Sequence, residues 1–466
     1  MNLRKVCTGL LFLFLSFSVT GKSPKYVFYF IGDGMGFNHI TATSLYQSAD
    51  VSDLTDKLLF PHFPVTGIVK TRSASHYITD SSAGGTALAT GHKANNKAVG
   101  LNAQHEPVYS IIHKAKTNKW TTGVITSTSV DDATPSSFYA HADSRGMYYE
   151  IGVQAAKSAI NFLGGAGFKS YTNPQNSNDP HLLDVLSANG FVVYKGLNQY
   201  KNEKKYNQPV VLIPDRDYPG TALPYAIDRT PEDLTLEQLT ASAIDYFKTN
   251  NVSRFMLVVE GGRIDHGSHP NDGATVIKEV IDMDKCIQLA YDFYMQHPKE
   301  TLIILTSDHE TGGLALGTVG SNLDLQSFDK QKASLGKLSG LIDGLHSQYP
   351  EGVRWEHVVT LLEENMGFWK GIEISKRDEE RLKACYEETF VTKSAKKIVT
   401  TYSVDEPLAM LAIEIINKHA NIGWTTKNHS GASVPVFAIG AGAEMFSGMM
   451  ENTDVPKRLE KVCRIK

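Results

Sequence analysis

Several short hydrophobic runs alternate with helical patterns along the chain, and this alternation limits the possible folds more than any other feature. Residues 26–31 are hydrophobic throughout, which is typical of a strand buried on both faces of a sheet. Apolar residues repeat with helical spacing over 276–290, between two later runs. Strands that alternate with helices predict a mostly parallel sheet with helices on both faces. We therefore expect an α/β fold, a three-layer αβα sandwich, whose other strands are 123–126, 192–194, 210–213, 255–259, 302–305 and 434–439.

Acidic residues, threonine and histidine follow several of these predicted strands. In open parallel sheets, functional side chains gather beyond the carboxyl ends of the strands. We therefore expect these side chains to meet along one edge of the sheet. They are Asp33, Asp132, Thr134, Glu260, Asp308, His309 and, just before the last strand, His429.

The residue types at these positions favour bound metal ions. Asp265 and His269 are four residues apart, so both face one point if their segment is a helical turn. Nitrogen and oxygen donors of this kind form catalytic zinc sites, and further donors are Asp308, His309 and His429. The other candidates donate only oxygen, which suits magnesium: Asp33, Asp132, Thr134 and Glu260. Taken singly, each residue also has an ordinary structural explanation, such as a turn or a helix cap.

The segment 79–91 begins with polar residues and continues with small, helix-forming ones. This pattern predicts a helix that starts within 79–82, where polar side chains cap free N–H groups. Because a helix N-terminus attracts anions, a serine there could hold or attack a phosphate. The alternative is an ordinary helix cap, and the local sequence does not distinguish Ser81 from Ser82.

The first 21 residues have the pattern of a secretory signal peptide. Arg4 and Lys5 precede an apolar run over 10–17 that is too short to span a membrane, and mostly small residues follow. We expect cleavage near Gly21 and export to the periplasm or out of the cell, with no later segment that spans a bilayer. Cleavage would leave 44 of the 46 basic residues and all 50 acidic ones, so no basic field predicts nucleic-acid binding.

Residues 320–424 are rich in charge and in helix signals, and we expect them to form an insertion in one large domain that covers 22–466. Ser375 and Asp378 form the pattern of a capping box, and leucines over 335–345 predict an amphipathic helix. The sequence leaves open whether the insertion is a lid, a dimer arm or a satellite subdomain.

Six segments of the chain resemble, in the same order, those of the alkaline phosphatases. They are IGDGMG at 31–36, TDSSAGGTALATGHKANNKAVG at 79–100, DATPSSFYAHADSR at 132–145, VEGGRIDHGSH at 259–269, TSDHETGG at 306–313 and HSG at 429–431. The resemblance implies a phosphoric monoester hydrolase that converts phosphate monoesters to an alcohol and inorganic phosphate. Because members of the family are commonly homodimers, it also implies a homodimer.

The resemblance further implies a role for each candidate residue. Ser81 would be the nucleophile that forms a phosphoserine intermediate, and Arg145 would hold two phosphate oxygens. Two zinc ions and one magnesium ion would be bound. The ligands would be Asp265, His269 and His429 for one zinc, Asp33, Asp308 and His309 for the other, and Asp33, Asp132, Thr134 and Glu260 for magnesium.

Two positions limit what the resemblance implies. Family members carry Asp or His at the position of Asp132, and Asp keeps this site all-oxygen, so we expect magnesium there and not a third zinc. His266 follows a zinc ligand, where other members carry various residues. We expect it either to reach the substrate phosphate through water or to be a solvated loop histidine.

Two other classes of protein compete with this interpretation. A related two-metal phosphodiesterase or sulfatase is the first, although no sulfatase-type activation motif follows Ser81. The second is an exported metal- or phosphate-binding protein built on the same scaffold.

Overall fold

The computed structural model describes residues 23–48, 52–53, 55–205 and 207–465. Its centre is a ten-stranded sheet with the order β16-β2-β15-β8-β1-β7-β3-β4-β6-β5. β15 is antiparallel to both of its neighbours, and the other neighbouring strands are parallel. The strands are β1 (Tyr26–Ile31), β2 (Val65–Lys70), β3 (Thr121–Thr126), β4 (Phe162–Gly164), β5 (Val192–Lys195), β6 (Val210–Ile213), β7 (Phe255–Glu260), β8 (Thr301–Thr306), β15 (Val434–Gly440) and β16 (Gly448–Glu451). The predicted α/β fold is confirmed.

All of the strands predicted from hydrophobic runs are present in this sheet, whereas β2, β4 and β16 were not predicted. The side chains of β2 alternate between buried and exposed, so this strand forms no continuous apolar run. β4 has only three residues, and β16 lies at the edge of the sheet with its first two residues exposed. β4 is buried but too short to form a recognisable run, whereas part of β2 and of β16 faces solvent, so all three leave a weak hydrophobic signal.

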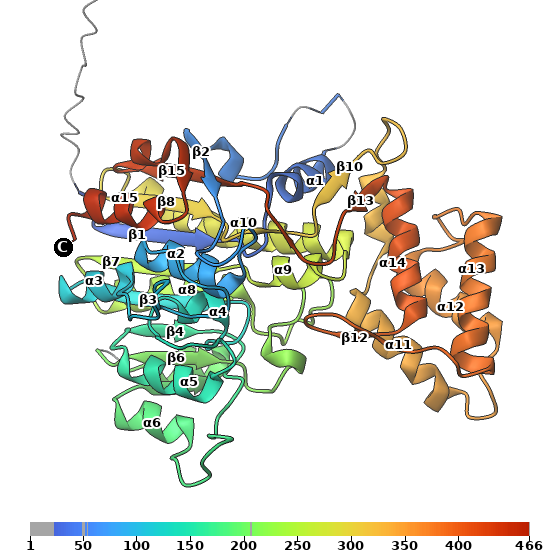
Figure 1. Cartoon of the computed structure of the whole chain (residues 1–466), viewed down its shortest axis with the longest axis horizontal. Coiled ribbons are helices and arrows are strands. Elements are labelled where there is room, and N and C mark those ends of the chain that lie inside the picture. The colour runs from blue at the N-terminus through green and yellow to red at the C-terminus, as the bar shows by residue number, and fades with distance from the viewer. Residues whose placement is uncertain (1–22, 49–51, 54, 206, 466) are drawn as a thin grey trace, which may run out of the picture.

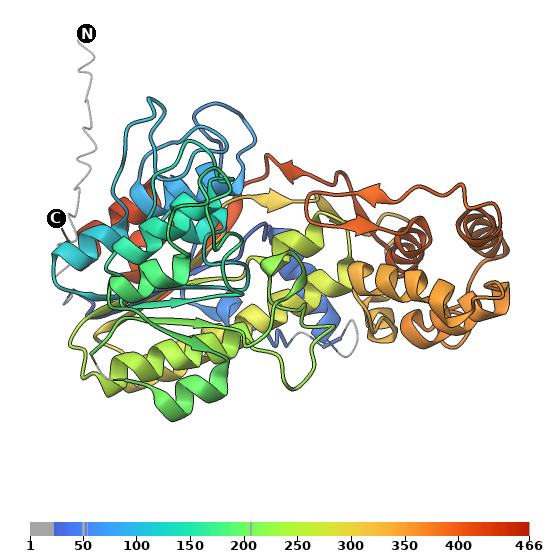
Figure 2. The same cartoon turned by 90° about the horizontal axis from the view of Figure 1, so that it is seen from below.

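Helices cover both faces of the sheet (Figure 2). Val27, Tyr29 and Ile31 of β1 belong to one apolar layer, and Phe28 and Phe30 belong to the opposite one. Helices α2, α3, α5 and α15 complete the first layer, and α8 and α10 contribute to the second. The helices of this part are α1 (Phe37–Gln47), α2 (Ser81–Thr90), α3 (Ile111–Thr117), α4 (Ala133–Ser136), α5 (Tyr148–Lys157), α6 (Leu182–Ala188), α7 (Leu197–Glu203), α8 (Leu236–Thr249), α9 (Arg263–Ser268), α10 (Gly273–Gln296) and α15 (Asp454–Cys463).

A second group of helices projects beside the sheet, drawn in orange to red in Figure 1. These are α11 (Leu335–Gln348), α12 (Trp355–Met366), α13 (Lys376–Tyr386) and α14 (Pro407–His419). They share an apolar cluster that also includes residues of α1 and α10, so the helices pack against the sheet-containing part. β10 (Leu314–Leu316) pairs with β13 (Ile422–Trp424) where the chain enters and leaves this group.

A hairpin of β11 (Ile398–Val399) and β12 (Val404–Asp405) extends from this helical group back toward α9 (Figure 1). The expected bounds of the insertion, 320–424, stay a prediction, as does its role. The expected signal peptide lies outside the described residues. Among the residues that the structure describes, none of the helices is both long and apolar enough to cross a membrane.

Candidate active site

Three parallel strands deliver acidic side chains to one edge of the sheet. Ile31 at the end of β1 lies opposite both Glu260 of β7 and Thr306 of β8. Asp33 and Asp308 follow two residues later, and both are buried. Gly34, which follows Asp33 in the chain, has a φ of +72°, and a Cβ on it would lie 2.9 Å from the Cα of Asp265. Glycine therefore lets the turn after β1 approach α9 closely.

The buried hydroxyl of Ser81 lies at the start of α2, beside this edge. Asp80 caps the helix, because its side chain accepts a hydrogen bond of 2.9 Å from the backbone N–H of Ala83. Ser81 Oγ lies 3.1 Å from Nε2 of His309, whereas Ser82 Oγ is buried without a hydrogen-bond partner. The contact with His309 therefore separates the two serines, which the local sequence could not do.

The first group of metal-ligand side chains consists of Asp33, Asp308 and His309, whose donor atoms lie within 4.8 Å of one another. Nε2 of His309 is 3.4 Å from Asp33 Oδ1 and 3.3 Å from Asp308 Oδ2. Thr134 donates from its hydroxyl to Asp33 Oδ2 (3.3 Å) and Asp308 Oδ2 (3.4 Å). Asp33 Oδ1 is buried and has no hydrogen-bond partner among the residues that the structure describes.

Burial and mutual repulsion raise the pKa values of these carboxyl groups. Burial and then Asp308 raise the pKa of Asp33 well above its usual value, and burial and then Asp265 raise the pKa of Asp308 to about 7. Burial also raises the pKa of Glu260 to about 8, although Thr126 donates a hydrogen bond to it. Several buried acids this close together need positive charge nearby, so the donor set and the unpartnered oxygen fit bound cations.

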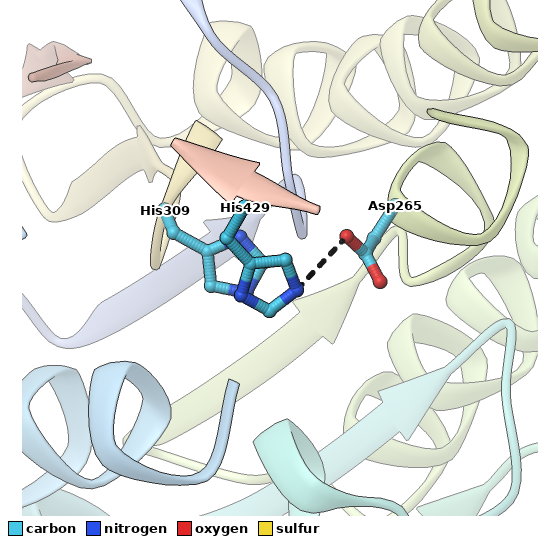
Figure 3. A group of neighbouring side chains, drawn as sticks. All are labelled: Asp265, His309 and His429. Atoms are coloured by element: carbon cyan, nitrogen blue, oxygen red, sulfur yellow. Dashed lines mark ion pairs between the residues drawn. The ribbon is translucent and has the colours of Figure 1, made fainter. Parts of the chain in front are cut away.

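The second group consists of Asp265, His309 and His429 (Figure 3). The rings of His309 and His429 are stacked with centroids 3.6 Å apart, and Nε2 of His429 lies 3.6 Å from Asp265 Oδ1. His269 is adjacent, with Nε2 3.4 Å from Asp265 Oδ2 and 3.2 Å from Nε2 of His429. His309 thus belongs to both groups. Asp265 Oδ2 is a buried oxygen without a hydrogen-bond partner.

Backbone carbonyls orient the two outer imidazoles. Nδ1 of His269 lies 2.6 Å from the carbonyl oxygen of Lys427, and Nδ1 of His429 lies 2.9 Å from that of Thr79. Since Nδ1–H donates to these carbonyls, Nε2 of each ring is left to bind a cation. The hydroxyl of Thr311 donates to Asp265 Oδ1 at 2.5 Å and fixes this carboxylate as well.

The charges of this group favour neutral imidazoles at His309 and His429 beside an ionised Asp265. Burial lowers the pKa of the adjacent His269, but Asp265 outweighs burial and raises it. Burial and then His429 lower the pKa of His309 well below its usual value, and burial lowers the pKa of His429. Burial raises the pKa of Asp265, but His269, His429 and His309 outweigh it and hold the pKa well below its usual value. Neutral imidazoles and a carboxylate are the forms that bind zinc.

Asp132 and Arg145 lie together, but Asp132 belongs to neither ligand group in the described residues. Nη2 of Arg145 donates to Asp132 Oδ1 at 2.8 Å, and Nζ of Lys169 donates to Oδ2 at 2.9 Å. Burial raises the pKa of Asp132, but Lys169 and Arg145 outweigh burial and hold the pKa below its usual value. Of the expected magnesium ligands, Thr134 contacts Asp33, whereas Asp132 is paired with these two cations.

His266 is buried with only 6% of its surface exposed, which does not fit a solvated loop histidine. Its Nδ1 lies 3.0 Å from Nη1 of Arg263, and its ring stacks on Tyr402 with centroids 3.7 Å apart. Burial and then Arg263 lower the pKa of His266 well below its usual value, so the ring is neutral. Tyr402 lies between β11 and β12 and therefore comes from the expected insertion.

Three residues of the site, Lys169, Thr311 and Tyr402, were not predicted from the sequence. Lys169 follows β4, which is too short to have been predicted, although the strand-end rule would have singled it out. Thr311 lies within the segment 306–313, but a threonine there has no distinctive chemistry by itself. Tyr402 carries no sequence signal, because its contact with His266 joins residues far apart in the chain.

The site places a buried serine beside two groups of metal-ligand side chains, at the carboxyl edge of a mostly parallel αβα sandwich. This arrangement is typical of a metal-dependent hydrolase with a serine nucleophile. Comparison with known protein families supports this class of enzyme. The alkaline phosphatase family model matches residues 24–165 and 197–465, and the chain belongs to this family. It is therefore a phosphoric monoester hydrolase, of a family that depends on metal ions.

Individual relatives are similar over nearly the whole chain. Alkaline phosphatase 4 of Bacillus subtilis is 30% identical over 442 residues, which cover 93% of this chain and 87% of that protein. The repressible alkaline phosphatase of Saccharomyces cerevisiae is 28% identical and covers 98% of this chain and 85% of its own length. The crystal structure of a cold-active alkaline phosphatase from a psychrophilic Shewanella species has a TM-score of 0.78 at 27% identity and covers 94% of this chain and 99% of its own.

Proposed function

We propose that the chain hydrolyses phosphate monoesters through a phosphoserine intermediate on Ser81, using two zinc ions and one magnesium ion. The observation that carries this proposal is the 3.1 Å contact between Ser81 Oγ and His309, the imidazole that belongs to both ligand groups. The nucleophile and the cation ligands therefore meet at one point, at the N-terminus of α2.

The residues that would hold the ions are those implied by the resemblance. Asp265, His269 and His429 would bind one zinc, and Asp33, Asp308 and His309 the other. The magnesium ligands would be Asp33, Asp132, Thr134 and Glu260. The unpartnered buried oxygens of Asp33 and Asp265 support both zinc sites. Bound zinc lowers the pKa of coordinated oxygen and neutralises charge on the phosphoryl group.

The magnesium proposal rests on the all-oxygen donor set. A solved mutant of the TAB5 alkaline phosphatase, in which aspartate replaces a histidine, has magnesium bound in its M3 site. That structure supports an aspartate in a magnesium site of this family. In the present chain Asp132 pairs with Arg145 and Lys169, so its carboxylate would also link the magnesium site to the phosphate-binding arginine.

The chain's own residues account for binding and for the nucleophile. The planar guanidinium of Arg145 would hold two phosphate oxygens, with Asp132 fixing its position. Ser81 Oγ would attack phosphorus, the bond from phosphorus to the ester oxygen would break, and the alcohol would leave with a proton. Water would then attack the phosphoserine and release inorganic phosphate and the free serine. Two in-line displacements retain the configuration at phosphorus.

Replacement of the nucleophile tests this proposal. Ser81→Ala should lower kcat for p-nitrophenyl phosphate by at least about a thousandfold, because no other hydroxyl at the site replaces the attacking atom. Ser82→Ala is the matched control, since it removes a buried hydroxyl that has no partner, and it should keep its activity. Turnover that survives in Ser81→Ala would contradict the proposal. Preferred hydrolysis of a phosphate diester or a sulfate ester would favour the competing enzyme classes.

We also propose that residues 1–21 are a cleaved signal peptide and that the mature protein is exported to the periplasm or secreted. We further propose that residues 320–424 are an insertion and that the protein is a homodimer. Sequencing of the mature N-terminus tests cleavage, and light scattering tests the dimer. An intact N-terminus in exported material, or a monomer at micromolar concentration, would contradict these points.

A further inference from the structure

A cavity of about 790 Å³ adjoins the proposed active site. It lies between the loop over 218–228, α9 and the β11–β12 hairpin, which extends toward α9 in Figure 1. His266 and Tyr402 line the cavity and also border the ligand residues, because the ring of Tyr402 lies 5.2 Å from that of His269. A volume of this size is in the range of small-molecule sites and is too small for a folded partner.

Flat side chains form a continuous row along this cavity. Tyr402 stacks on His266, and Nδ1 of His266 meets Nη1 of Arg263 at 3.0 Å. The guanidinium of Arg263 in turn lies over the ring of Tyr225, 3.4 Å from its centroid. Tyr218 lies in the same wall. Planar groups arranged in this way favour a planar ligand, because aromatic and guanidinium faces stack on rings.

The row also carries the positive charge of Arg263, which interacts with the nearby carboxyl groups of Asp228 and Glu279 without pairing with either in the described residues. In the part of the chain that the structure describes, Arg263 forms no ion pair with a carboxylate, and its buried Nε has no hydrogen-bond partner. The nearby Asp228 instead accepts hydrogen bonds of 2.9 Å and 2.5 Å from the backbone N–H and the hydroxyl of Ser334, which is the N-cap residue of α11. Arg263 is therefore left to donate to an acceptor on a ligand.

We propose that this cavity binds the alcohol part of the substrate, and that it selects phosphate monoesters whose alcohol carries a planar ring with hydrogen-bond acceptors, as nucleoside 5′-monophosphates do. The proposal rests on the phosphomonoesterase function proposed above. The phosphate would lie at Ser81 and Arg145, and the ring would lie between Tyr402 and the stacked pair of Arg263 and Tyr225. Tyr402 is then a specificity-determining residue that the helical group supplies to the site.

The test compares adenosine 5′-monophosphate with ribose 5-phosphate. Both release a primary alcohol from the same sugar position, so their kcat/KM ratio isolates the contribution of the base. The wild type should prefer the nucleotide. Tyr402→Ala and Tyr225→Ala should each lower the ratio about tenfold, the effect of losing one stacking partner. Tyr402→Phe should keep the ratio, as should Tyr109→Ala, an exposed tyrosine outside the cavity.

A second measurement does not depend on the variants folding. Adenosine should inhibit hydrolysis of p-nitrophenyl phosphate by the wild type, and ribose should not. A wild type that hydrolyses both sugar phosphates equally well, or a ratio that stays the same in both alanine variants, would overturn the inference while leaving the phosphatase function intact. Failure of the metal-loaded wild type to hydrolyse either compound would instead refute the proposed function itself.

Discussion

Removal of the metal ions should make the folded protein less stable as the pH rises. In the folded protein, burial and then Asp265 raise the pKa of Asp308 to about 7. Burial raises the pKa of Glu260 to about 8, although a hydrogen bond from Thr126 opposes this shift. In the unfolded chain these groups titrate near 3.8 and 4.5. The folded state therefore holds protons that the unfolded state has lost, and the stability this provides is lost as the pH rises through 7 and 8.

The size of the loss follows from the difference in bound protons. Each group costs about 1.4 kcal/mol per pH unit between its unfolded and folded pKa values. From about pH 5 upward this amounts to roughly 3 kcal/mol for Asp308 and roughly 4 kcal/mol for Glu260. The repulsion between the two acids contributes to the raised pKa of Glu260 and must not be counted twice. The combined loss is therefore expected to be smaller than the sum of the two, on the order of 5 kcal/mol. The depressed pKa of Asp265 acts only at lower pH. The lowered pKa values of His309 and His429 oppose the loss below about pH 6.5, because the unfolded imidazoles hold protons there that the folded ones lack.

Urea unfolding of chelator-treated protein, followed by fluorescence from about pH 5 to about pH 9, measures the loss. The metal-free protein should lose more stability over this range than the protein reloaded with zinc and magnesium, because the cations neutralise the carboxylates of Asp308 and Glu260. Asp308→Asn should make the metal-free protein more stable at the alkaline end, where the wild-type carboxyl is charged. A metal-free wild type that loses no more stability with rising pH than metal-free Asp308→Asn would contradict this prediction.

Two further substitutions test contacts around the site. Lys169→Met removes one of the two cations on Asp132, a contact worth about 1.5–3 kcal/mol. Because Arg145 is then drawn toward the carboxylate, kcat/KM should fall about 10- to 100-fold. Unchanged kinetics would count against this role of Lys169. Thr311→Val keeps the side-chain shape but removes the 2.5 Å hydrogen bond to Asp265, so zinc affinity in a chelator competition should fall about 10- to 100-fold. Equal zinc affinity in the two proteins would show that this hydroxyl does not position the ligand.

Much of the fold could be predicted because its central strands are hydrophobic throughout. β7 and β8 are buried along their whole length and β1 along all but its first residue, so their apolar runs are visible in the sequence. The acids at their ends could therefore be placed at one edge. β2 and β16 could not be found in this way, because part of each strand faces solvent. Which serine faces the ligand groups also had to come from the structure or from the family.

The rest of the site depends on contacts between distant segments. Tyr402 meets His266 only because the β11–β12 hairpin returns from the helical group, and no local pattern encodes that path. Lys169 reaches Asp132 through a loop after a three-residue strand. The sequence therefore identified the residues with metal-binding chemistry but not those that position them or shape the neighbouring cavity.

In the proposed mechanism, Ser81 carries the phosphoryl group between two displacements. Rapid acid quenching of the metal-loaded enzyme during turnover of a phosphate monoester, followed by mass spectrometry of its peptides, tests this claim directly. We predict a phosphopeptide with the phosphate on Ser81 and none on Ser82. Phosphate on another residue, or steady turnover without any phosphopeptide, would contradict the account.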